Sequence, residues 1–219
     1  HRADRMRTHL GRSGIVTEAI FDAGYNSNSR FYEKSAEVLG MKPTQYRRGG
    51  AQQDIRFAVG QCSLGAVLVA SSAKGVCAIL LGDDPDALAR DLQDRFPQAN
   101  LIGGDAGFEA RVAAVVGLVE APTRSLDLPL DVRGTAFQQR CWQALRQIPA
   151  GETRSYGEQA AMLGNPKASR AVGSANGANN IAVLIPCHRV VPASGGVGGY
   201  AYGPEIKAEL LKREGSSAS

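Results

Sequence analysis

Apolar and polar residues recur at helical spacing within the first fifty residues. Val16–Ala23 is a short amphipathic segment, and a second helix is predicted over Arg30–Leu39; each is followed by a glycine. The polar run at residues 26–29 supplies turn and N-cap residues between them. Helix, tight turn and helix, with Arg30 and Lys34 on the second helix, is the spacing of a helix-turn-helix, although any small helical hairpin has the same pattern.

A second part of the chain begins after a linker at residues 49–53. Short apolar runs bounded by Gly and Ser predict three strands, over Ile55–Val59, Gly65–Ala70 and Val76–Leu81. Two helices are predicted to follow, over Pro85–Phe96 and Phe108–Glu120. The pattern indicates a small α/β unit, with no catalytic grouping of its own.

Helix signals become stronger beyond residue 131. The sequences Thr-x-x-Gln at 135–138 and Ser-x-x-Glu at 155–158 are capping boxes, and each opens a predicted helix. Asn165 is expected to cap a further helix, with Pro166 at its first position and Gly177 just past its end. The last two helices then form a second helix-turn-helix.

Charge is unevenly distributed along the 219 residues. Residues 1–50 carry nine Lys/Arg against five Asp/Glu, residues 51–130 six against ten, and residues 131–219 ten against six. Basic segments suit a polyanion, although the bias is modest. The apolar runs are too short to span a bilayer. The start of the chain lacks Met and any signal peptide, and is interpreted as a cut within a longer chain.

Four widely spaced cysteines occur without a CxxC pair, which argues against a disulfide framework and against a zinc site. Reduced thiols in a cytoplasm are the better interpretation. Cys62, Cys77 and Cys141 are predicted to be packed thiols, the last on the buried stripe of a helix.

Cys187 differs, because it is followed by His188 after a buried-type run, and a thiolate–imidazole pair is a nucleophile. Adjacent residues of an extended chain point to opposite sides, so a bridging water is the simpler geometry. His188 would then need a carboxylate on its other nitrogen. A buried Cys beside a His is also common without any function.

The surrounding residues carry a family resemblance. From residue 135 to 214 the chain closely resembles the O6-alkylguanine-DNA alkyltransferases. The matching elements, in order, are Ser155-Tyr156-Gly157, Gly164-Asn165-Pro166, Arg170-Ala171-Val172-Gly173, Asn179, the run Ile185 to Val191, Gly198-Gly199-Tyr200, and Lys207-x-x-Leu210-Leu211-x-x-Glu214. Residues 54–130 fit the family's N-terminal α/β domain less distinctively.

The resemblance implies catalytic roles. Cys187 would accept the alkyl group, with His188 activating it through water and Glu214 orienting His188. Asn179 would bind backbone near the active site and hold its geometry. Tyr156 would donate a hydrogen bond to the flipped guanine.

The resemblance also implies a substrate pocket and a DNA contact. Main-chain groups of Cys187 and Val190 would read the amino edge of the guanine, and Tyr200 with Ala201 would line the pocket. Arg170 would enter the base stack in place of the extruded base.

The residues themselves agree with that DNA contact. The helix expected over residues 166–176 has a face of small side chains, which lets its backbone approach a groove closely: Ala168, Ala171, Gly173, Ser174 and Ala175. Arg170 is the one long side chain in its middle. A helix face of small side chains with a single long one suits minor-groove binding and base extrusion better than major-groove readout.

Residues 1–48 look like the second half of an AraC-type DNA-binding domain, through Val16–Ile20, Ala23–Tyr25, Ser29–Tyr32 and Gly40–Arg47. An AraC-type domain ahead of an alkyltransferase is the arrangement of Ada-type adaptive-response proteins. The zinc domain and the first AraC helix-turn-helix of that arrangement are not in this chain. Phosphotriester repair is therefore not expected.

The expected fold class is α+β. It comprises a partial AraC-type helix-turn-helix over residues 1–50, a small RNase H-like α/β domain over 51–130, and a mainly helical, winged-helix-turn-helix-like domain over 131–219.

The expected function is direct, single-use transfer of the alkyl group of O6-methylguanine, and of O4-methylthymine, onto Cys187. No cofactor, metal or membrane is expected. The expected partner is double-stranded DNA, and the full-length protein is expected to bind promoter DNA as well. The chain is expected to be a monomer located at the nucleoid, in a bacterial cytoplasm. Two alternatives stay open: a transcription-regulator fragment whose alkyltransferase fold only binds DNA, and a cysteine hydrolase built on Cys187 and His188.

Overall fold

The computed structural model describes residues 53–103, 106–122 and 126–216. The predictions made for residues 1–50, including the two helices and the DNA contacts of Arg30 and Lys34, lie outside the described residues. Within those ranges, no helix is both long and apolar enough to cross a membrane.

The first half of the described chain is a four-stranded sheet in the order β3-β2-β1-β4. The strands β1 (Asp54–Cys62), β2 (Gly65–Ser72) and β3 (Gly75–Gly82) form an antiparallel meander, which confirms the three predicted strands. The short β4 (Asn100–Gly103) pairs in parallel with β1 and was not predicted. Its four residues show no alternation of apolar and polar side chains, and they form a strand only through pairing with β1.

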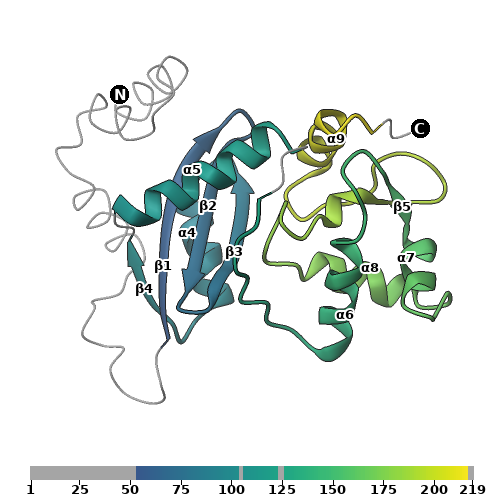
Figure 1. Cartoon of the computed structure of the whole chain (residues 1–219), viewed down its shortest axis with the longest axis horizontal. Helices are drawn as coiled ribbons and strands as arrows, with labels where there is room; N and C mark the ends of the chain where they lie inside the picture. The colour runs from purple at the N-terminus through teal and green to yellow at the C-terminus, as the bar shows by residue number, and fades with distance from the viewer. Residues whose placement is uncertain (1–52, 104–105, 123–125, 217–219) are drawn as a thin grey trace.

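One helix covers each face of this sheet, because successive strand residues point to opposite sides. The helix α4 (Pro85–Arg95) packs Leu88 and Leu92 on one face, with Leu68 and Leu80. On the other face lies α5 (Ala106–Glu120), in front of the strands in Figure 1. Both predicted helices are confirmed within two residues.

The second half of the described chain is mainly helical, so the expected α+β class is confirmed. A connector at residues 126–135 leads to α6 (Ala136–Leu145), α7 (Tyr156–Met162) and α8 (Ser169–Gly177), which pack against one another. Both capping boxes are present at the predicted residues. The last helix, α9 (Pro204–Arg213), lies next to the sheet half in Figure 1.

The predicted start of α8 is wrong. The N–H of Asn165 donates to the carbonyl of Ala160 and that of Gly164 to Ala161, which is the hydrogen-bond pattern that closes the C-terminus of α7. Asn165 therefore ends one helix instead of capping the next. The chain makes a further turn, and α8 begins at Ser169 without a side-chain cap.

One core joins the two halves. The sheet face under α5 is continuous with buried residues of the helical half, among them Cys141, Trp142 and Ile185. The indole N–H of Trp142 donates to the carbonyl of Ala175, 2.8 Å away, and ties α6 to α8. Cys77 and Cys141 are buried free thiols, as predicted, while Cys62 is half-buried.

The turn before β3 requires a glycine, and this gives a stability prediction. Gly75 has a φ of +146°, and a Cβ there would lie 2.2 Å from the carbonyl oxygen of Pro129. We expect Gly75→Ala to lower the free energy of unfolding by about 2–4 kcal/mol. Gly117→Ala is the matched control, since its Cβ would meet nothing within 4 Å inside α5, and it should raise stability by about 0.5–1 kcal/mol. Urea unfolding followed by circular dichroism measures both; equal effects would contradict the assignment.

Candidate active site

Two tight turns shape the segment that leads to Cys187. The N–H of Leu184 donates to the carbonyl of Ala182 around Val183, whose φ of 69° is uncommon for a β-branched residue. The N–H of Cys187 donates in the same way to Ile185 across Pro186. Cys187–Arg189 then form a turn of 3-10 helix. The expectation of an extended Cys-His pair is therefore wrong at this point, because these turns coil the backbone.

Asn179 holds this segment at both ends. Its Oδ1 accepts from the N–H of Ile181 at 3.0 Å, and its Nδ2 donates to the carbonyl of Ile185 at 2.8 Å. Nδ2 also lies 3.2 Å from Sγ of Cys187. The three contacts fix the loop and place a hydrogen-bond donor against the sulfur.

A buried carboxylate lies beside His188. Nε2 of His188 is 2.9 Å from Oε1 of Glu214, and both side chains are fully buried. Glu214 directly follows α9 and comes from 26 residues further along the chain. The structure thus brings together His188 and the carboxylate predicted for it.

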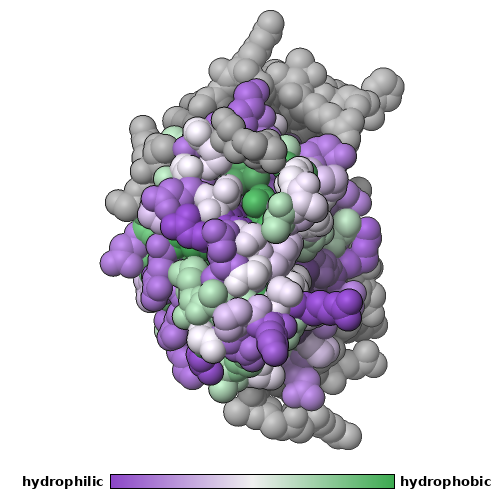
Figure 2. Space-filling view, turned by 90° about the vertical axis from the view of Figure 1, so that its right-hand side faces the viewer, coloured by the Kyte–Doolittle hydropathy of each residue, from purple (hydrophilic) through white to green (hydrophobic). Residues whose placement is uncertain are grey.

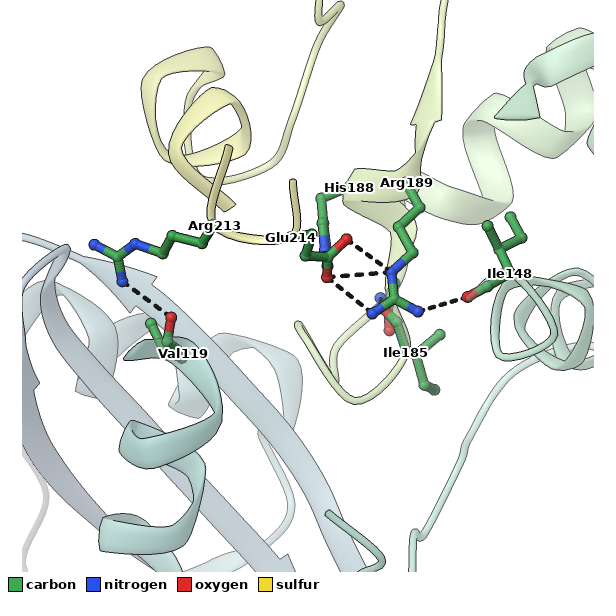
Figure 3. A network of polar contacts seen from close by, with 8 residues as sticks. Val119, Ile148, Ile185, His188, Arg189, Arg213 and Glu214 are labelled. Carbon is green, nitrogen blue, oxygen red and sulfur yellow. Dashed lines mark hydrogen bonds and ion pairs between the residues drawn. The ribbon is translucent and has the colours of Figure 1, made fainter. Parts of the chain in front are cut away.

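Arg189 completes the cluster, as Figure 3 shows. Its guanidinium binds both carboxylate oxygens of Glu214, with contacts between 2.8 and 3.2 Å, and donates to the carbonyl of Ile148 at 2.5 Å. Burial opposes ionisation of Glu214, but the hydrogen bonds from His188 and Arg189 hold the pKa of its carboxyl below the ordinary value. Glu214 is therefore an anion that orients His188.

The two groups that could exchange a proton both rest in their neutral forms. Burial raises the pKa of the Cys187 thiol, against the opposing effects of Asn179 and Lys207. Burial likewise lowers the pKa of His188, more than Glu214 raises it. Nδ1 of His188 has no hydrogen-bond partner among the described residues. A neutral imidazole with Glu214 on Nε2 has Nδ1 available to accept a proton.

A cavity of ≈ 350 Å³ opens beside the sulfur. Its lining combines glycines with aromatic rings: Tyr156, Gly173, Asn176, Gly177, Cys187, Gly199, Tyr200 and Ala201. Tyr156, Tyr200 and Ala201, predicted to contact the substrate, are thus brought to Cys187. The ring of Tyr200 packs edge-on against Tyr202, with centroids 5.4 Å apart. The size and lining suit one flat aromatic group.

Lys207 and Arg189 were given no role by the sequence reasoning. Lys207 is fully buried, and its Nζ donates to the carbonyls of Val190 at 2.6 Å and Gly199 at 3.2 Å. Burial lowers the pKa of Lys207 to about 8, although Cys187 opposes this effect. The available signal was its helical spacing, since Lys207 shares a face with Leu210, Leu211 and Glu214.

The predicted DNA contacts lie on α8. Arg170, Ala171 and Ser174 are exposed, and Gly173 lines the cavity. Arg170 is the second residue of the helix, not in its middle as predicted, because α8 begins at Ser169. Figure 2 shows the side of the molecule on which α7 lies as a mixture of hydrophilic and intermediate residues, with hydrophobic residues only in small patches.

Comparison with known proteins gives a consistent result. The family described as "6-O-methylguanine DNA methyltransferase, DNA binding domain" matches residues 136–216. The "Bifunctional transcriptional activator/DNA repair enzyme Ada" of Escherichia coli is 48% identical over 97% of the chain. The chain spans 60% of that relative's length. A methylated-DNA–protein-cysteine methyltransferase of Methanosarcina acetivorans is 58% identical over 42% of the chain and 60% of its own length.

The similarity extends to solved structures. The structure of Mycobacterium tuberculosis OGT in complex with DNA matches with a TM-score of 0.61 and 36% identity, over 74% of this chain and 92% of that one. The match reaches beyond the helical half and includes sheet residues, because the helical half alone is too short to account for it.

The buried Glu214 cluster yields a prediction with a defined pH dependence. Glu214→Gln should lower the free energy of unfolding at neutral pH by roughly 3–5 kcal/mol, because His188 and Arg189 lose a buried charged partner. A carboxyl whose folded pKa is depressed stabilises the fold above its unfolded pKa of about 4.3, and this contribution is lost as the pH falls through the folded value. Urea unfolding measured between neutral and acidic pH should therefore show a smaller loss of unfolding free energy in Glu214→Gln than in wild type. Glu205→Gln, an exposed carboxylate in the first turn of α9, is the control and should keep the wild-type slope.

Proposed function

The chain belongs to the 6-O-methylguanine DNA methyltransferase family, and we propose that it repairs DNA by moving the alkyl group of O6-methylguanine irreversibly onto Cys187. The observation that carries this proposal is the placement of Sγ of Cys187 at a ≈ 350 Å³ cavity, beside a buried His188–Glu214 pair. O4-methylthymine is the second substrate that we propose.

Transfer begins with removal of the thiol proton. His188 accepts it through a bridging water, while Glu214 orients the imidazole and stabilises its charge. The thiolate attacks the alkyl carbon; the S–C bond forms as the C–O6 bond breaks, and the electron pair goes to the guanine oxygen. Tyr156 donates a hydrogen bond to that oxygen. The imidazolium of His188 gives up the thiol proton through water, the guanine takes up one proton in exchange, and the repaired base stays attached to the DNA. The thioether on Cys187 remains, so each molecule acts once.

Substrate contacts follow from the cavity lining. Tyr200 and Ala201 pack against the base, and the carbonyls of Cys187 and Val190 accept from its amino group. The Val190 carbonyl already accepts from Lys207, and its second lone pair leaves room for this contact. Asn179 keeps the loop, and therefore the carbonyl of Cys187, in place.

DNA binding is assigned to α8. We place it in the minor groove, where the small residues Ala171, Gly173 and Ser174 allow close approach and Arg170 fills the stack after the base has flipped out. The protein acts as a monomer at the bacterial nucleoid. The finer architecture, an RNase H-like unit before residue 131 and a winged-helix-turn-helix-like unit after it, belongs to the same proposal and is supported by the strand order and the packing of α6, α7 and α8.

In its full length, the protein is proposed to be an Ada-type regulator of the adaptive response. This proposal is supported by the similarity to the Escherichia coli transcriptional activator and repair enzyme, which covers 97% of this chain. The alternative is a regulator fragment that binds DNA and transfers nothing.

Intact mass after incubation with duplex DNA containing O6-methylguanine tests the transfer. We expect one added methyl group on Cys187, lost in Cys187→Ser and kept in Cys62→Ser, since Cys62 lies outside the cavity. DNA binding with an unchanged wild-type mass would favour the binding-only alternative. Repeated turnover of an ester or peptide would favour a cysteine hydrolase.

Arg170 can be tested separately from the chemistry. Arg170→Ala should slow methyl transfer from duplex DNA roughly 10- to 100-fold, because an extruded base then leaves an unfilled stack. Its reaction with free O6-methylguanine base should stay at the wild-type rate, as measured by single-turnover kinetics. Lys167→Ala removes a neighbouring exposed charge and should weaken DNA binding with little effect on the transfer rate at saturation. If both variants had the same effects on transfer rate and DNA binding, Arg170 would be a phosphate contact and would not fill the base stack.

A further inference from the structure

One residue of the sheet edge anchors both walls of the cavity. Ile79 lies in β3, at the edge of the four-stranded sheet. Its N–H donates to the carbonyl of Asn180 at 2.8 Å, and its carbonyl accepts from the N–H of Ala182 and the hydroxyl of Tyr202, each at 3.2 Å. The loop that carries Cys187 and the loop that carries Tyr200 are therefore both hydrogen-bonded to the sheet half.

A side chain of the sheet half reaches the same loop. Nε and Nη2 of Arg95, the last residue of α4, bind both oxygens of Asp91 at 2.8 and 2.9 Å. Nη1 donates to Oδ1 of Asn180 at 2.6 Å. Because Asp91 holds the planar guanidinium with two bonds, the third bond is directed without further loss of side-chain freedom.

Asn180 is thus fixed through its main chain by Ile79 and through its side chain by Arg95. The preceding residue is Asn179, whose Nδ2 lies 3.2 Å from Sγ of Cys187. Hydrogen bonds weaken steeply with distance and angle, so a small shift of the backbone at residue 180 would weaken the contact to the sulfur.

We propose that Arg95 is a positioning residue for alkyl transfer, acting through Asn180 to hold the Asn179 amide against the Cys187 sulfur. The proposal rests on the function proposed above for Cys187, but its geometry does not depend on DNA. A donor held against sulfur stabilises the thiolate over the thiol, and it aligns the nucleophile with the cavity. The helix α4 would then serve the reaction without touching the substrate.

Arg95 can be replaced without creating a closed void. Arg95 and Asn180 line an open cavity of ≈ 560 Å³ on the sheet side, together with Arg133 and the chain at residues 96–99. Solvent can fill the space that a shorter side chain leaves. Asn180→Ala tests the same link from its other end and leaves the Arg95–Asp91 pair intact.

The test follows the intrinsic reactivity of the Cys187 thiol. Full chain is labelled with iodoacetamide across a pH series, and labelling of Cys187 is measured on its peptide by mass spectrometry. We expect Arg95→Ala and Asn180→Ala to raise the apparent pKa of this thiol and to slow its labelling at neutral pH roughly three- to tenfold. Asn180→Asp keeps the acceptor for Arg95 but adds a negative charge, so its thiol should label faster than that of Asn180→Ala and no faster than wild type.

Two controls separate positioning from charge and from folding. Arg90→Ala removes an exposed arginine from the same helix, one that pairs only weakly with Asp84 at 3.6 Å, and should not move the profile. The double variant Arg95→Ala/Asn180→Ala should be no slower than either single variant, because both break one link. Every variant keeps the titratable groups that interact with the sulfur and the buried acid–base pair beside it: Tyr156, Tyr200, Tyr202 and Lys207, with His188 and Glu214.

Several outcomes would overturn the positioning role. Arg95→Ala and Asn180→Ala could label like Arg90→Ala, the double variant could be additive, or the rate could fall only in step with a lower urea midpoint. Methyl transfer by the wild-type chain reports separately on the proposed function. If wild type takes no methyl group but the variants still shift the thiol profile, the proposed function fails and the positioning role stands.

Discussion

The buried pair of His188 and Glu214 is the interaction around which the helical half is arranged. Removing a carboxylate from water is costly, and the protein offsets that cost with three donors, one from His188 and two from the guanidinium of Arg189. To supply them, the end of α9 must lie against the turn that carries Cys187. The position of the nucleophile and that of the C-terminal helix are therefore set by one electrostatic requirement.

The same burial defines the resting state of the site. Desolvation favours a neutral thiol on Cys187 and a neutral imidazole on His188, although Asn179, Lys207 and Glu214 oppose it. A thiol that stays protonated until substrate arrives is protected from indiscriminate alkylation and oxidation. Such restraint suits the single-use acceptor role proposed above for Cys187.

The sheet half takes part in this arrangement through its edge. An exposed β3 would offer unpaired N–H and C=O groups, and the structure covers them with the segments at residues 129–131 and 180–182. The hydrogen bonds that pair this strand edge with residues 180–182 also hold the loop before Cys187 in place. Arg213 forms a second link between the two halves, because its guanidinium donates to the carbonyl of Val119 at the end of α5 (Figure 3). The core that joins the two halves packs them together beside these links.

Local sequence by itself determined much of this protein. Short apolar runs and turn residues were sufficient for β1, β2 and β3, and the capping boxes for the starts of α6 and α7. The family resemblance of residues 135–214 grouped Cys187, His188 and Glu214. These features depend on neighbours within a few residues, or on a pattern of residue types that survives without coordinates.

Tertiary structure decided the rest, since the deciding contacts join residues far apart in the chain. β4 exists only through β1, and α8 begins late because Asn165 is used by α7. The roles of Arg189 and Lys207 depend on carbonyls and a carboxylate that no local pattern locates. Arg95 meets Asn180 across 85 positions, and only the packing of α4 beside the sheet edge brings that guanidinium to the loop of the nucleophile.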